Sequence, residues 1–128
     1  MSSGRALFRP EKENGPFHLN NPKFNQLVLG CADGHVYIVD NYELLKYAYI
    51  DYHIQVVKAY RPSFISKDEA DYILIGGHFP NLLVYQNQNL LLSISQEDWV
   101  FDICTRPEMI ATACMNNSMY FLTLEPDD

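Results

Sequence analysis

The chain has 128 residues, the usual size of a single domain. Its 16 acidic and 9 basic residues give a formal net charge of -7, which disfavours nucleic-acid phosphates and anionic lipid surfaces as partners. The sequence has no run of about 18 apolar residues, so we expect no membrane insertion.

Residues 1–22 are predicted to form a flexible N-terminal leader, because glycine and proline recur among charged residues there. From residue 23 onward the sequence changes to short apolar runs rich in β-branched and aromatic residues, separated by Asp, Asn, Gly and Pro. This pattern is typical of strands joined by tight turns. Residues 23–128 are therefore predicted to be all-β.

The first pair of strands belongs to an internal repeat. Residues 27–40 align without a gap on residues 73–86, which lie 46 positions further on, and Gly30 falls on Gly76. A further shift of 37 positions brings residues 110–123 onto the second copy, with Ala113 at the glycine position. A repeat of this kind determines the architecture before any single element does.

Each copy is predicted to be a hairpin, with turns at Asp33-Gly34, Phe79-Pro80 and Asn116-Asn117. A third strand follows the first two hairpins, and one more strand precedes the second and third; these are residues 44–50, 90–94, 54–60 and 99–104. Four strands in about 41 residues is the period of a propeller blade. Apolar residues at matching repeat positions are the expected core: Leu29, Val36, Ile38, Ile75, Leu82, Val84 and Met119.

Short strands at regular spacing also fit a β-sandwich or meander. The propeller is favoured because the self-similarity covers the glycine, the turn and the strands together. The fold class we expect is a partial β-propeller of about two and a half four-stranded blades.

Residues 98–104 and 109–124 resemble the inner and central strands of a WD-repeat blade. The terminal Trp-Asp dipeptide of that family is matched only by Asp40, so the resemblance is to a degenerate propeller. Residues 27–60 and 72–85 look like a blade of the FG-GAP-type intracellular propellers, and are similar to propellers of ciliary cargo coats and vacuolar-sorting tethers. The FG-GAP calcium loop has no counterpart here, and we expect no cofactor.

This resemblance implies a non-catalytic scaffold or adaptor that binds other proteins in a larger cytoplasmic complex, including partners that supply the missing blades. Tyr47, Tyr49 and Trp99 are the candidate binding residues. Tyr47 and Tyr49 alternate and so should share one face of a strand. Trp99 would serve either as core or as an interface residue, because tryptophan is both highly buried and favoured at interfaces.

The scattered histidines have no metal-ligand spacing, and no recognised nucleophile motif surrounds any cysteine or serine, so we expect no enzyme. Cys31, Cys104 and Cys114 are expected to be buried free thiols in a reducing compartment. Two alternatives stay open. One is a small enzymatic or ligand-binding β-domain with a pocket among His35, His78 and Cys31, and the other is a truncated, non-functional fragment.

Overall fold

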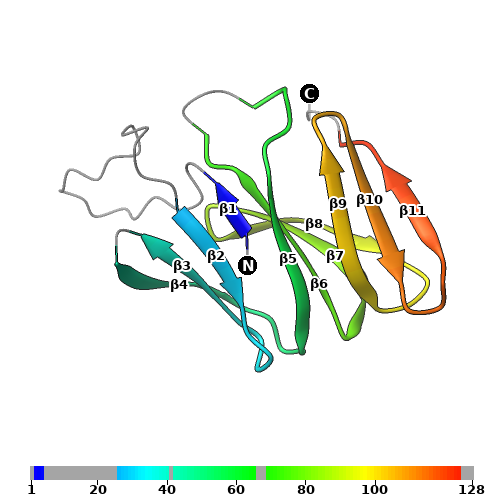
Figure 1. Cartoon of the computed structure of the whole chain (residues 1–128), viewed down its shortest axis with the longest axis horizontal. Helices are drawn as coiled ribbons and strands as arrows, with labels where there is room; N and C mark the ends of the chain where they lie inside the picture. Colours follow the sequence, from blue (N-terminus) through cyan, green and yellow to red (C-terminus); the bar gives the residue numbers. More distant parts are fainter. Residues whose placement is uncertain (1, 5–25, 41, 66–68, 125–128) are drawn as a thin grey trace.

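The computed structural model describes residues 2–4, 26–40, 42–65 and 69–124. These ranges form three antiparallel sheets that lie side by side, with turns between their strands and no helix (Figure 1). The prediction of an all-β chain is therefore confirmed. The sheets follow the order of the sequence, so each one is built from consecutive strands.

The N-terminal sheet has the strand order β1-β2-β3-β4, comprising β1 (Ser2–Gly4), β2 (Gln26–Gly30), β3 (His35–Asp40) and β4 (Glu43–Tyr49). The predicted leader needs a correction, because its residues 2–4 pair antiparallel with β2. Strand pairing uses the backbone N–H and C=O groups, so a polar segment without an apolar pattern can still form an edge strand. The rest of the predicted leader lies outside the described residues.

The central sheet has the order β5-β6-β7-β8, comprising β5 (Ile54–Tyr60), β6 (Tyr72–Gly77), β7 (Phe79–Gln86) and β8 (Asn89–Ser95). In the C-terminal sheet, β10 (Met109–Cys114) lies between β9 (Val100–Arg106) and β11 (Met119–Leu122). The four-strand unit predicted for residues 54–94 is confirmed. The turn predicted at Phe79-Pro80 is wrong: the chain reverses at His78, and Phe79 already pairs with Gly77.

The internal repeat extends to individual hydrogen bonds. The Cys31 N–H donates to the His35 carbonyl, and the Cys114 N–H donates to the Ser118 carbonyl, each at 2.9 Å. Gly34 in the first turn has φ 98°, and Asn117 at the same position of the second has φ 72°. Glycine and asparagine are the residues that tolerate this left-handed conformation, so two different sequences build the same turn.

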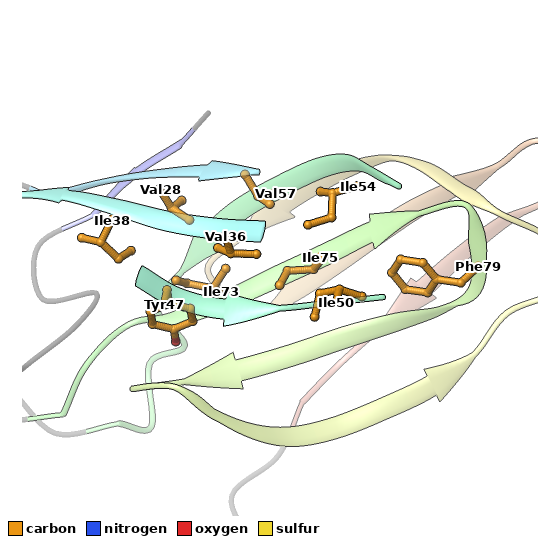
Figure 2. Close-up of a cluster of buried hydrophobic side chains, with 10 residues drawn as sticks. All are labelled: Val28, Val36, Ile38, Tyr47, Ile50, Ile54, Val57, Ile73, Ile75 and Phe79. Carbon is orange, nitrogen blue, oxygen red and sulfur yellow. The ribbon is translucent and has the colours of Figure 1, made fainter. Parts of the chain in front are cut away.

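The first seam is the contact between the N-terminal and central sheets. Val28, Val36 and Ile38 from one sheet pack against Ile73 and Ile75 from the other, and all five side chains are buried. Figure 2 shows these side chains directed into the space between the two sheets, with Ile50, from the β4–β5 connection, beside Ile75. Apolar burial of this kind is the main force holding sheets face to face.

The second seam joins the central and C-terminal sheets. Leu74, Leu82 and Val84, on the opposite face of the central sheet, pack with Ile103 and Ile110. Every residue of β6 is buried, because the strand is covered on both faces. The expected core positions Val36, Ile38, Ile75, Leu82 and Val84 are thus confirmed.

The two seams differ at a pair of repeat positions. Gln96, which corresponds to Ile50, is buried and accepts a hydrogen bond from the Thr112 hydroxyl at 2.8 Å. Thr112 in turn corresponds to Ile75. The second seam therefore holds a polar pair where the first holds two isoleucines.

Gly30 and Gly76 occupy equivalent sites in the two seams. A Cβ on Gly30 would lie 2.7 Å from Ile54 Cγ2, and a Cβ on Gly76 would lie 2.7 Å from Val100 Cγ1. Ile54 and Val100 are themselves 46 positions apart, at the start of β5 and β9. The absence of a side chain at both glycines therefore permits close packing between strands of neighbouring sheets.

Two expected core positions are wrong. Leu29 is half-buried and Met119 is 61% exposed. Their repeat equivalents Ile75 and Leu82 are buried because a neighbouring sheet covers them, whereas Leu29 and Met119 face outward from the first and last sheets. The repeat register is right, but no sheet in the described part of the chain covers these faces.

Candidate functional site

Tyr47 and Tyr49 lie on opposite faces of β4, so their predicted shared face is wrong. Val36 pairs with Ala48 and Tyr37 pairs with Lys46, which leaves Tyr47 as the extra residue of a β-bulge. A bulge shifts the alternation of side chains by one residue. Strict alternation, on which the prediction depended, therefore fails at this point.

Tyr47 is a core residue with 3% of its surface exposed. Its ring packs against Tyr85, with the ring centroids 6.2 Å apart. Burial raises the pKa of the Tyr47 hydroxyl to about 12, because the charged phenolate is disfavoured away from water. The side chain is not available to a partner in this structure.

Tyr49 is 56% exposed and lies on the outward face of the N-terminal sheet. Its hydroxyl donates to Asp51 Oδ1 at 3.1 Å, and this hydrogen bond to the neutral phenol raises the pKa of Tyr49. The ring centroid of Tyr49 lies 4.8 Å from that of His35. Tyr49 is thus held in place by two contacts while half of it remains accessible.

Trp99 lies just before β9 and is 41% exposed. Its indole stacks on the imidazole of His78, with ring centroids 4.3 Å apart and planes inclined by 14°. The imidazole of His53 also stacks on that of His78, with ring centroids 4.1 Å apart and planes inclined by 10°. Three rings from three separate chain segments therefore form one stack.

The stack continues into a wider aromatic end of the molecule, which we define as Tyr52, His53, His78 and Trp99. Tyr52 follows the N-terminal sheet, is exposed, and packs against Phe79 with ring centroids 5.3 Å apart. Two backbone hydrogen bonds of 2.9 Å fix the segments: His78 N–H to the His53 carbonyl, and Met115 N–H to the Trp99 carbonyl. The aromatic end bridges all three sheets.

Sequence reasoning named Trp99 as a binding residue and His78 only in the alternative pocket, and it missed Tyr52 and His53. His53 lies 46 positions before Trp99, so the repeat already placed both residues at equivalent points before the first strand of a sheet. His78 was not placed at the turn, because the turn was predicted at the two residues that follow it. The available signal was the repeat itself, applied to the residues between strands.

Carboxylates border the aromatic end. Glu97 accepts hydrogen bonds from the Ser118 hydroxyl at 2.9 Å and from the Asn116 amide at 3.3 Å, and these bonds lower the pKa of Glu97. The Asp98 carboxylate accepts a bond from the Trp99 backbone N–H at 2.7 Å. The surface therefore combines exposed aromatic rings with ionised acidic groups.

The two histidines considered for a pocket with Cys31, His35 and His78, take part in different ring contacts in the described part of the chain. His35 contacts Tyr37, Tyr49 and Asp33, whereas His78 lies in the aromatic end. Across the described ranges no group of three or more His, Cys, Asp or Glu side chains could hold a metal ion. An open hollow of about 270 Å³ lies elsewhere, lined by Ala59, Tyr60, Arg61, Thr105, Arg106 and Pro107.

The three cysteines are free thiols, as expected, but only Cys114 is fully buried. Cys31 is half-buried and Cys104 is exposed on β9. Cys104 is exposed for the same reason as Met119: it lies on the outward face of the C-terminal sheet, opposite Ala111.

No helix among the residues that the structure describes is long and apolar enough to cross a membrane. A scan of the chain against protein-family models finds no match. A search of the curated proteins finds no match either.

Proposed function

We propose that this chain is a non-catalytic protein-binding module, a scaffold or adaptor whose three sheets are consecutive blades of a β-propeller and whose aromatic end contacts partner proteins. The blade interpretation is supported by the equivalence of the two seams. In both seams, a glycine of one sheet lies directly against the first residue of the next sheet's first strand. Equivalent stacking of consecutive units is what a repeat architecture requires.

The observation that carries the binding role is the stack of Trp99, His78 and His53, open to solvent at one end of the sheets. Tryptophan and tyrosine are the residues that contribute most to protein interfaces, because they bury large areas at a low cost in conformational entropy. A stacked ring is already oriented before binding, which lowers that cost further.

A cytoplasmic location agrees with this role. Three free thiols, one of them exposed, are typical of a reducing compartment. The net charge of -7 supports protein partners over nucleic acid.

Partner capture with a matched pair of variants tests the proposal. Trp99→Ala removes an exposed ring from the aromatic end, whereas Leu90→Ala shortens an exposed apolar side chain on the edge strand β8. We expect the wild type and Leu90→Ala to retain the same proteins in quantitative mass spectrometry after cross-linking in cells. Trp99→Ala should retain them at least roughly tenfold less, the loss expected for an interface residue worth about 1.4 kcal/mol or more.

Both variants should keep the wild-type circular dichroism spectrum and melting temperature within a few degrees. If a folded Trp99→Ala variant retains the same proteins as the wild type, the aromatic end is not the binding surface.

A further inference from the structure

The two seams use the faces of the sheets in the same way. The inner face of the N-terminal sheet packs on one face of the central sheet, and the opposite face of the central sheet packs on the inner face of the C-terminal sheet. The N-terminal and C-terminal sheets thus lie at the two ends of the row (Figure 1). Each of them keeps one outward face.

The outward face of the C-terminal sheet carries residues whose repeat equivalents are covered by a neighbouring sheet. Met119 and Phe121 correspond to Leu82 and Val84, which are fully buried in the second seam. Met119 and Phe121 are 61% and 64% exposed. Ala113, opposite Met119, replaces the glycine of the two seams, so this face lacks the close contact that Gly30 and Gly76 make.

The outward face of the N-terminal sheet carries the complementary set. Leu27 and Leu29 correspond to Ile73 and Ile75, the central-sheet residues that cover Val28, Val36 and Ile38 in the first seam. On the neighbouring strand, Tyr37 and Val39 correspond to Leu83 and Tyr85, which also pack in that seam. All four outward residues are only half-buried.

The chain therefore holds both halves of one further seam, at opposite ends of its row of sheets. We propose that a second copy of this chain is the occupant: the outward face of its N-terminal sheet docks on the outward C-terminal face, as a continuation of the two seams within the chain. This inference rests on the blade interpretation above. Because the two faces differ, the contact is head-to-tail, and it closes into a ring or continues to longer assemblies.

Light scattering coupled to size-exclusion chromatography tests the proposal on the full chain. At micromolar concentrations we expect a mass that is a multiple of 14.8 kDa and that falls on dilution. A mass of 14.8 kDa throughout, with cooperative thermal unfolding, would overturn the proposal.

Variants on the two faces test the head-to-tail geometry. Phe121→Asp changes only the C-terminal outward face, and Leu29→Asp changes only the N-terminal one. Each variant alone should run as a monomer, because a buried unpaired charge opposes docking. An equimolar mixture should form a two-chain complex, since each variant supplies the face that the other has lost.

Leu90→Asp on β8, which lies on neither outward face, is the matched control and should assemble as the wild type does. Circular dichroism checks that each variant folds; if Leu29→Asp does not, Tyr37→Asp on β3 replaces it. Assembly that is lost in Phe121→Asp but kept in the N-terminal variant would indicate two C-terminal faces packed on each other, and would overturn the head-to-tail contact.

The two proposals fail separately. A monomeric wild type that still loses its partners upon Trp99→Ala would overturn self-association and leave the aromatic end as a binding surface. A wild type that assembles, and whose Trp99→Ala variant keeps its partners, would support self-association and overturn the aromatic end as the binding surface.

Discussion

Single residues at equivalent repeat positions decide how closely the sheets approach. Gly76 is the clearest case, because the atoms that a Cβ would meet belong to Val100: Cγ1 at 2.7 Å, Cβ at 2.8 Å and the carbonyl oxygen at 3.2 Å. No flexible chain end is available to move aside. The absence of a side chain at this position is therefore a packing requirement.

We predict that Gly76→Ala lowers the free energy of unfolding by about 1–3 kcal/mol, the usual cost of overpacking. The measurement is urea denaturation followed by circular dichroism. Val100→Ala in the same chain should recover part of this loss, so that the double variant is more stable than the sum of the single changes by about 0.5–3 kcal/mol. Strict additivity in this cycle would show that Gly76 and Val100 do not interact.

Tyr47 makes the stability of the fold depend on alkaline pH. Burial raises the pKa of the Tyr47 hydroxyl to about 12, whereas the unfolded chain loses this proton near the ordinary tyrosine pKa of 10.0. Below pH 10 the Tyr47 hydroxyl is protonated in both the folded and the unfolded state, so the stability of the fold does not change through its titration. Between about pH 10 and 12 the unfolded state releases its proton and the folded state does not, so the fold loses stability as the pH rises.

We predict that the loss between pH 9 and pH 11 is smaller in Tyr47→Phe, by about 1 kcal/mol, because phenylalanine has no proton to release. Denaturation midpoints at pH 9 and pH 11 measure it. Tyr42→Phe, at a fully exposed ring, is the control and should follow the wild type. Equal pH slopes in wild type and Tyr47→Phe would contradict the assignment.

At the scale of elements, β6 and β8 of the same sheet show opposite environments. β6 is buried along its whole length, while β8 is an edge strand with exposed leucines at positions 90–92. Both strands are apolar in sequence. What separates them is their place in the sheet, since β6 has a strand on either side and a sheet over each face.

We therefore predict that Leu74→Ala destabilises the fold by about 2–5 kcal/mol, as expected for a buried leucine that leaves a cavity. Leu90→Ala, the same chemical change on β8, should alter the free energy of unfolding by less than about 0.5 kcal/mol. Thermal and urea denaturation of both variants measure the difference. Similar losses in the two variants would mean that β8 is covered in solution.

Sequence patterns predicted most of the elements, because hairpin turns and strand alternation are local properties. The bounds of β5, residues 54–60, were predicted without error. β1 was missed because a three-residue edge strand leaves no apolar pattern, and the burial of Tyr47 was missed because nothing in the local sequence marks the bulge there. The candidate site was predicted only at Trp99, since the ring stack joins segments from three parts of the chain.

At the scale of the whole molecule, the described residues form a row of three sheets with two closed seams and two faces that no other described strand covers. Errors in the predicted core lie only on the open faces, at Leu29 and Met119. A repeat pattern identifies which positions pack against a neighbouring unit, but it does not say whether that neighbour belongs to the same chain.

The Gln96–Thr112 pair gives the second seam a specificity that the first seam lacks. The Gln96 side chain accepts a hydrogen bond from the Thr112 hydroxyl within a buried contact, at positions that hold isoleucines in the first seam. If the C-terminal sheet packed on the other face of the central sheet, Thr112 would lie against isoleucines and its hydroxyl would lose this acceptor. A buried hydroxyl without a partner costs about 1–3 kcal/mol, so we expect the pair to favour the observed order of the sheets.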